Sequence, residues 1–276
     1  MSNERLLNAS GRMRFAGTAL LSTLLLAGCG DSLGVDGPGN VSVSFHASDA
    51  PSAATAPQAG ASAPSRITYE GANGTLVLEQ VLMIVSEVEL DLEDDCDDDA
   101  RDDDAFDDCE DFEAGPQLVD LALDGAPIPV LSGLVAPGVY DELEFEIEDL
   151  DDDDDDRRVA LDELMEEIVA LVPDWPRNAS LYVTGTFQPT DGDPVPFRTF
   201  IDAEIEIELE LRPELVIGDD GAASRELVVD VRPDLWLLDS QGQVRDMGEW
   251  DYDTTGRILE LEVEIEDGFI EVEFDH

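Results

Sequence analysis

The chain has 276 residues, of which 68 are Asp or Glu and 14 are basic, so its formal net charge is −54 at pH 7. A surface this acidic repels nucleic acid and anionic lipid headgroups, which excludes nucleic-acid binding and argues against membrane binding through charge. Hydrophobic residues make up 43% of the chain, enough for a core and too many for disorder throughout.

Residues 1–28 have the organisation of an export signal. Arg5, Arg12 and Arg14 precede an apolar run that ends in the letters L-A-G-C at positions 26–29. The run has about 13 residues, whereas a membrane-spanning helix needs roughly 20. We therefore expect a cleaved signal peptide rather than a transmembrane anchor.

The letters L-A-G-C resemble the lipobox of bacterial lipoproteins. This resemblance implies that residues 1–28 are removed and that Cys29 is acylated, with palmitate as the expected fatty acid. It also implies a mature chain held outside the cytoplasm by its lipid. Because Gly30 rather than aspartate follows the cysteine, the outer membrane is the expected location in a cell with two membranes.

The segment after the lipobox is expected to be a tether. Residues 29–40 are rich in Gly and Asp, and a domain is expected over 41–276. Apolar and polar residues alternate from Val41 to His46, which predicts a strand. Residues 47–65, rich in Ala, Ser and Pro, predict a long loop.

A strongly apolar stretch follows at 76–92, long enough for one bent strand or two. Its segment Val81 to Val85 is continuously apolar, which predicts a buried central strand. An acidic loop is expected at 93–113. Further strands are expected from Gln117 and, after the Pro137-Gly138 turn, over Val139–Ile147.

One helix is expected, over about 158–171. Leu161, Leu164 and Ile168 recur at helical spacing, and Pro173 closes the segment. The acidic run 151–156 precedes it. A division into two sub-domains near 150–178 is the alternative to one domain.

The remainder again alternates with a period of two. We expect a strand over Leu181–Phe187, a long strand from Ile201 to Leu211, and shorter segments at Leu227–Val231 and Trp236–Leu238. The pair Asp267-Gly268 between two alternating runs predicts a terminal hairpin of 258–266 with 269–274. The predicted fold class is therefore all-β, an antiparallel β-sandwich with one inserted helix and long acidic loops.

Two cysteines remain once Cys29 is assigned to the lipid. In an oxidising compartment, Cys96 and Cys109 are expected to form a disulfide that closes the acidic loop. Carboxylates are the ligands that calcium prefers, so this loop is also a candidate cation site, although its spacing fits no EF-hand. The alternative is a solvated acidic loop. The candidate ligands are Asp97, Asp98, Asp99, Asp102, Asp103, Asp104, Asp107 and Asp108.

Two rows of glutamates are expected on strand faces. They comprise the even-numbered glutamates of 204–210 and of 260–266. Like charges directly opposite one another destabilise a sheet, so either these strands are not neighbours or cations and salt screen them.

The sequence contains no G-x-S-x-G, H-E-x-x-H, phosphate-loop or dinucleotide motif, so no catalytic residue is predicted and a non-catalytic protein is expected. Trp175, Trp236 and Trp250 are more often core residues in a sandwich than a platform for stacking sugars.

Several short motifs resemble an uncharacterised family of bacterial lipoproteins. They are VSVSF with SDAP (41–51), LVDLALDG (118–125), PGVYDELEFEI (137–147), VTGTFQP with GDPVPF (183–197) and VDVRPDLW (229–236). The resemblance implies a β-sandwich domain of unknown function, transthyretin-like or carbohydrate-binding-like in outline, and implies no catalytic residue.

Three functions are compatible with these features. The first is a lipid-anchored envelope module that binds or supports an unidentified partner. The second is a calcium-binding protein that uses loop 93–113. The third is a protein that binds or hydrolyses envelope polysaccharide.

Overall fold

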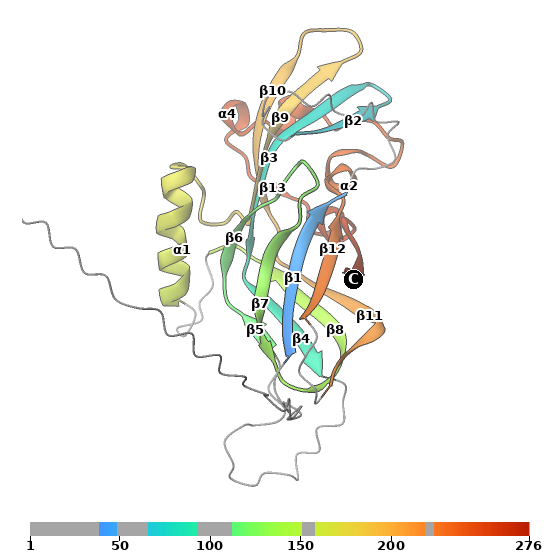
Figure 1. Cartoon of the computed structure of the whole chain (residues 1–276). Helices are drawn as coiled ribbons and strands as arrows, with labels where there is room; N and C mark the ends of the chain where they lie inside the picture. Colours follow the sequence, from blue (N-terminus) through green and yellow to red (C-terminus); the bar gives the residue numbers. More distant parts are fainter. Residues whose placement is uncertain (1–38, 49–65, 93–111, 151–157, 219–223, 276) are drawn as a thin grey trace, which may run out of the picture. The chain divides into compact units, whose positions relative to one another are not determined.

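The structure is a computed structural model, and it describes residues 39–48, 66–92, 112–150, 158–218 and 224–275. Contacts divide the chain into Met1–Leu33 and one compact unit, Gly34–His276. All of the described residues belong to this second unit (Figure 1).

The described strands form three sheets, which we name A, B and C. Sheet A has the strand order β14 (Phe269–Asp275), β12 (Ser224–Val231), β1 (Gly39–Ala47) and β7 (Ile128–Val135). Sheet C has the order β11 (Ile205–Ile217), β8 (Gly138–Ile147), β4 (Glu87–Leu92) and β5 (Phe112–Ala114). Sheet B has the order β13 (Leu259–Glu260), β10 (Val195–Asp202), β9 (Leu181–Pro189), β3 (Gly74–Val85) and β2 (Ile67–Gly71), and β6 (Gln117–Asp120) also pairs with β3.

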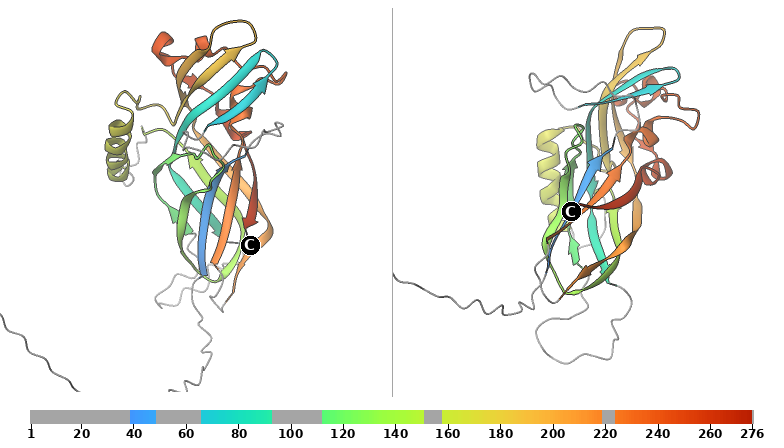
Figure 2. Two further views of the ribbon diagram at one scale, coloured as in Figure 1. Left: turned by 45° about the horizontal axis from the view of Figure 1, so that its top comes forward. Right: turned by 45° about the vertical axis from the view of Figure 1, so that its right-hand side comes forward.

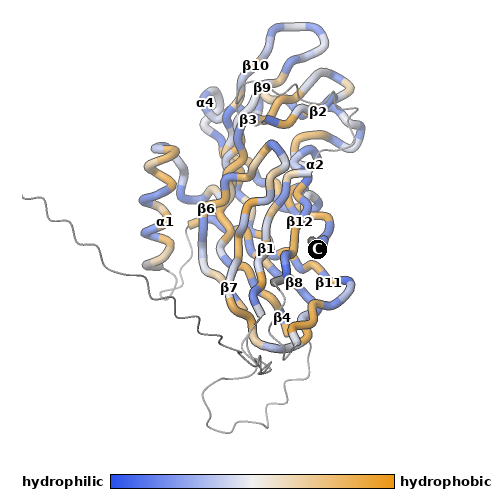
Figure 3. Tube along the Cα trace, in the orientation of Figure 1, coloured by the Kyte–Doolittle hydropathy of each residue, from blue (hydrophilic) through white to orange (hydrophobic). Residues whose placement is uncertain are grey.

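Sheets A and C pack face to face and form the sandwich (Figure 2). Alternate residues of each strand point into the space between them, because side chains alternate across a strand. The ring of Phe145 from sheet C lies 5.0 Å from that of Phe45 and 5.0 Å from that of Phe269, both of sheet A. Orange, apolar positions accordingly alternate with blue ones along these strands (Figure 3). The predicted all-β sandwich is confirmed.

Two strand pairs run parallel, although most pairs are antiparallel. Strand β12 pairs with β1 in parallel, and β13 pairs with β10 in parallel. Antiparallel neighbours can follow one another directly, whereas parallel neighbours need a long connection. Both parallel pairs join segments that are far apart in the chain.

Among the described strands, the chain passes from sheet B to sheet C at two points, from β3 to β4 and from β10 to β11. It passes from β3 to β4 at Ser86, whose buried N–H donates to the carbonyl of Glu146. The stretch 76–92 is therefore two strands, and every residue from Val81 to Val85 is buried, as predicted. The predicted single strand from Ile201 to Leu211 is wrong, because it is interrupted at Ala203 between β10 and β11.

The predicted helix is present as α1 (Arg158–Leu171). Its apolar stripe, including Leu161, Leu164 and Ile168, packs against sheet B in a second core with Leu82 and Phe200. Within the described residues, no helix is long and apolar enough to cross a membrane.

The C-terminal segment departs furthest from expectation. Short helices α2 (Pro233–Leu237) and α5 (Glu262–Glu266) stand where strands were predicted. Two more, α3 (Met247–Trp250) and α4 (Tyr252–Thr255), lie in a stretch for which no element was predicted. The predicted terminal hairpin is wrong, because β13 pairs with β10 whereas β14 pairs with β12. Leu261 and Ile265, four residues apart, are both buried while Val263 is exposed, which is helical spacing inside an alternating sequence.

Three predicted boundaries shift by a few residues. The expected tether 29–40 ends earlier, since β1 already begins at Gly39. The expected acidic loop 93–113 also ends earlier, since Phe112 and Glu113 belong to β5 and pair with β4. The expected loop 47–65 begins after Ala47, the last residue of β1, and its residues 49–65 lie outside the described residues.

Candidate functional site

The site residues predicted from the sequence lie outside the described residues. These are Cys29, the cysteines Cys96 and Cys109, and all eight aspartates from Asp97 to Asp108. The lipid site, the disulfide and the calcium loop therefore stay predictions. The described residues hold two further groups of carboxylates, one on the outer face of sheet C and one where sheets B and C meet.

The first group is the acidic sheet face, which consists of the outward-pointing acidic residues of three adjacent strands. The central strand β8 contributes Glu142, Glu144 and Glu146, and its neighbours carry an acidic residue opposite each one. The full set is Glu87, Glu89, Asp91, Glu142, Glu144, Glu146, Glu206, Glu208 and Glu210. Three residues of the glutamate row predicted on 204–210, namely Glu206, Glu208 and Glu210, are thus part of a larger array, whereas Glu204 precedes β11. The row predicted on 260–266 is not a strand face.

This array places like charges directly opposite one another, which destabilises a sheet. The cost is visible at Glu144, which is half-buried at the centre of the array. Burial, the largest cause, and the neighbouring charges of Glu206, Asp91 and Glu89 together raise the pKa of Glu144 to about 7. The pKa of Glu142 is raised for the same reasons, with burial again the largest cause.

The acidic sheet face is better suited to loosely held cations than to one coordinated ion. Carboxylate oxygens of Asp91, Glu142 and Glu144 lie within 4.8 Å of one another. However, all these side chains leave one face of one sheet, so they supply oxygens from a single side. Calcium takes six to eight oxygen ligands arranged around it. We therefore interpret this face as a screened, self-repelling surface.

The second group, the junction cluster, consists of Asp149, Asp202 and Glu204. Their carboxylate oxygens lie within 4.8 Å of one another. Asp149 follows β8 and is buried, Asp202 ends β10 and is half-buried, and exposed Glu204 precedes β11. The cluster therefore gathers acidic groups from separate segments at the point where the chain passes between sheets B and C.

Hydrogen bonds around Ser180 explain why these segments meet. The buried hydroxyl of Ser180 donates to the carbonyl of Ile201 and accepts from the N–H of Ala203, at 3.3 Å and 2.9 Å. This second bond satisfies a backbone donor where β10 ends, which allows the chain to leave sheet B. On the other side, the N–H of Leu150 donates to the carbonyl of Arg177.

The electrostatics of the junction cluster centre on Asp202. Burial raises its pKa, the charges of Asp149, Glu204 and Glu260 raise it further, and a hydrogen bond from Asn178 lowers it. Glu260 lies opposite Asp202 in the parallel β10–β13 pair. Carboxylates brought in from separate segments and partly desolvated supply the oxygen ligands that a hard cation such as calcium prefers.

Sequence reasoning predicted one row of the acidic sheet face, on 204–210, but missed the rest of that face and the junction cluster. The alternation of 87–91 and 142–148 could have marked two further acidic strand faces. Nothing local could place Asp149 beside Asp202, because they lie more than fifty residues apart and meet only through strand pairing.

Elsewhere on sheet B, arginine neutralises acidic groups. Arg198 donates to Asp174 at 2.8 Å and also pairs with Asp253, and its guanidinium lies over the rings of Phe200 and Tyr252. The hydrogen bond from Arg198 lowers the pKa of Asp174. This neutralised pair contrasts with the junction cluster, where the pKa of Asp202 is raised.

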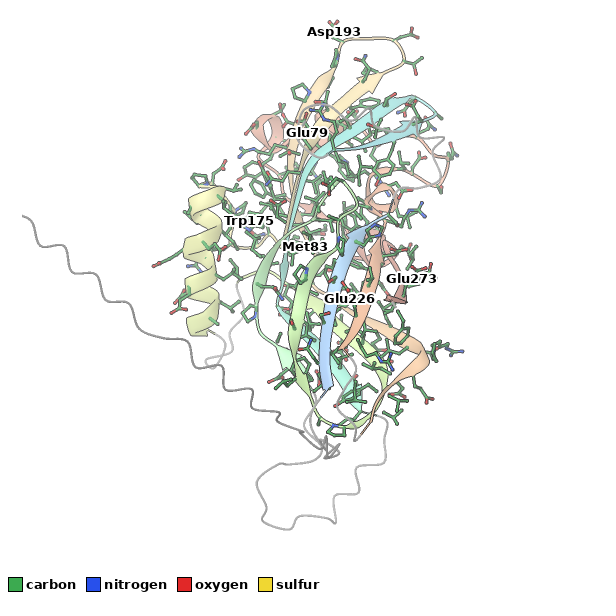
Figure 4. All side chains as sticks on the ribbon, in the orientation of Figure 1. Glu79, Met83, Trp175, Asp193, Glu226 and Glu273 are labelled. Carbon is green, nitrogen blue, oxygen red and sulfur yellow. The ribbon has the colours of Figure 1, made fainter. Side chains whose placement is uncertain are left out.

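The tryptophans do not form a common platform. Trp175 is buried near α1 and donates to the carbonyl of Ala179 (Figure 4). Trp236 is buried in the other core, and half-buried Trp250 lies against Arg245. These positions fit the expectation that the tryptophans serve the core.

His46 is the histidine that the described residues contain, and it pairs with an acid. Its Nδ1 lies 3.0 Å from Oδ1 of Asp230, the residue opposite it in the parallel β1–β12 pair. The nearby hydroxyl of Ser48 donates to the carbonyl of Val231. The pair therefore links two strands of sheet A.

No family model matches this chain, and no curated protein matches it. Among solved structures, it is similar to MbnP from Methylosinus trichosporium, with a TM-score of 0.30 and 12% sequence identity. The match covers 70% of this chain and 75% of that chain. Similarity at this level is too low to assign a shared fold or function.

Proposed function

We propose that this protein is a lipid-anchored, extracytoplasmic, non-catalytic module that binds a hard cation, calcium in preference to magnesium, at the junction cluster. The observation that carries the proposal is the convergence of Asp149, Asp202 and Glu204 within 4.8 Å. The acidic loop 93–113 is a second candidate set of ligands, supported by its sequence.

Coordination chemistry supports calcium over magnesium. Calcium accepts six to eight oxygens in flexible geometry, whereas magnesium demands a near-ideal octahedron and keeps several waters. The junction cluster combines two aspartates and a glutamate, with Glu260 nearby, and these side chains differ in length and come from different segments. Such a mixed set suits the more permissive ion.

Electrostatics support a cation at this position as well. Placing several carboxylates together in a partly desolvated site costs free energy, and the raised pKa of Asp202 reflects that cost. A bound divalent cation would reverse the sign of the local potential and remove the repulsion. It would also stabilise the folded state by mass action.

Calcium should raise the melting temperature of the full-length chain above the effect of salt alone. At a hundredfold excess over the dissociation constant, one site contributes roughly 2.7 kcal/mol, which corresponds to about 8 °C for a chain of this size. The measurement is thermal melting in about 1 M sodium chloride, where surface charges are screened, with and without calcium.

The variant Asp202→Asn tests whether the junction cluster is the site. It should lose most of the calcium-dependent rise, whereas Glu271→Gln, which removes one exposed carboxylate from sheet A, should keep it. Calorimetry then gives the stoichiometry. If Asp202→Asn retains the full rise, the site is elsewhere, with loop 93–113 as the alternative. If calcium adds nothing to the wild type, the proposed cation binding is wrong.

The proposed lipid anchor is supported by the leader sequence and its lipobox-like end. A chain of this charge would be repelled by anionic lipids, so a covalent lipid would have to supply the attachment. A single acyl chain binds membranes only marginally, and stable anchoring requires more than one.

Metabolic labelling with a palmitate analogue should tag the wild-type protein. Cys29→Ala should abolish the tag and release the protein from the membrane fraction, because the acylated side chain is gone. Cys96→Ala is the matched control and should remain labelled. Labelling that persists in Cys29→Ala would overturn the proposal.

A further inference from the structure

The outer edge of β10 in sheet B is covered by one continuous stretch of chain. Among the described strands, only the two-residue β13 pairs with β10 on that side. The helices α3 and α4, which precede β13 in the chain, also contact β10 (Figure 1). We name residues 247–260, which contain α3, α4 and β13, the edge cover.

A side chain of the edge cover takes the place of a neighbouring strand. The backbone N–H of Arg198 in β10 donates to Oδ1 of Asp251 at 3.3 Å, so this N–H points away from β9. Because backbone groups alternate along a strand, those of Pro196 and Asp202 point the same way. Pro196 has no N–H to offer, and Asp202 lies opposite Glu260 of β13. The outer edge of β10 is therefore closed at each of these positions.

Ring and ion contacts attach the edge cover to β10. The ring of Tyr252 packs edge-on against buried Phe200, with 4.8 Å between the ring centres. The guanidinium of Arg198 lies over the Tyr252 ring at 5.7 Å and pairs with Asp253. Asp253 is exposed, and exposed ion pairs contribute little. The attachment therefore depends mainly on the Tyr252 ring and on the hydrogen bond to Asp251.

The sequence of β10 suits pairing with a second copy of itself. An uncovered edge strand is a template on which a strand of another chain can add. In an antiparallel pair of two β10 strands centred on Phe200, Arg198 of each copy lies opposite Asp202 of the other. Opposite charges in such positions stabilise a sheet. This pairing would bring together one of the few surfaces of a chain with net charge −54 on which two copies attract each other.

We propose that the edge cover prevents this chain from dimerising through sheet B. While Asp251 holds the N–H of Arg198, β10 is closed to a second copy. When the edge cover moves away, two copies join through their β10 strands and sheet B becomes continuous across the dimer.

The variant Asp251→Ala of the full-length chain tests the proposal, because it removes the acceptor of the Arg198 N–H. In dilute protein at low salt, this amide should exchange its hydrogen about tenfold faster than in the wild type. In about 1 M sodium chloride, where the screening length is about 3 Å, the variant should sediment as a dimer and the wild type as a monomer. In that dimer the Arg198 amide should be protected again, because it pairs across the new strand interface.

Asp251→Asn is the matched control. It removes the same charge, but its amide oxygen still accepts the hydrogen bond, so it should follow the wild type in both measurements. Unchanged exchange in Asp251→Ala, faster exchange without a dimer, or a dimer in which the Arg198 amide stays exposed would each overturn the proposal. So would equal behaviour of Asp251→Ala and Asp251→Asn.

Hydrogen exchange of the wild type gives a second test that does not depend on the folding of a variant. The Arg198 amide should be protected as strongly as those of Phe197 and Thr199, whose backbone groups face β9. Rapid exchange at Arg198 alone would show that the edge of β10 is open in the native chain, which contradicts the proposal.

Discussion

Replacement of Gly268 by alanine should lower the melting temperature by about 9 °C, because it costs about 3 kcal/mol of folding free energy. A Cβ at this buried position would overlap Nε1 of Trp236. Trp236 is fully buried and donates to the carbonyl of Ile265 at 3.2 Å, so it has little room to move. The N–H of Arg232 also donates to the carbonyl of Gly268, which fixes the backbone there.

The control for this prediction is Gly115→Ala. A Cβ at Gly115 would meet nothing within 4 Å, so the melting temperature should change little. Thermal denaturation of both variants, followed by circular dichroism, makes the comparison. Equal stability of the two variants would show that Trp236 and the segment around Gly268 do not pack as described.

Sodium chloride should raise the melting temperature of the full-length chain by about 8 °C between low salt and about 1 M. The register of sheet C sets acidic pairs directly opposite one another, three between β11 and β8, three between β8 and β4, and one between β4 and β5. Each such pair destabilises a sheet by a few tenths of a kcal/mol to about 1 kcal/mol, so together they cost about 3 kcal/mol. Salt removes much of that cost, because the screening length shrinks from about 10 Å at 0.1 M to about 3 Å at 1 M.

A triple variant tests whether the acidic sheet face is the cause. Glu206→Gln, Glu208→Gln and Glu210→Gln together remove the charges of β11 from this face. The triple variant should melt higher than the wild type at low salt and respond less to sodium chloride. If both proteins gain the same number of degrees, the salt response comes from the rest of the acidic surface instead.

Features that depend only on the spacing of residues close together in the chain could be predicted from the sequence by itself. Side chains alternate across a strand, so the strand residues from Val41 to Phe45 and from Leu143 to Ile147 could be assigned to a buried face without knowing their partners. Helical spacing likewise predicted α1 at 158–171. The all-β class follows from such local periods, which need no information about pairing.

Only the tertiary structure decided which segments become neighbours. The terminal hairpin was predicted because Asp267-Gly268 favours a turn locally. In the structure, burial of Leu261 and Ile265 and pairing of β14 with β12 stabilise a helical turn there instead. The junction cluster likewise exists because hydrogen bonds of Ser180 end β10 beside the end of β8. Strand pairing is non-local, since a two-residue period marks which face a side chain occupies and leaves open which strand lies beside it. For that reason acidic residues that look alike in the sequence differ in the fold, where Asp174 is neutralised by Arg198 while Asp202 and Glu144 are held against other carboxylates.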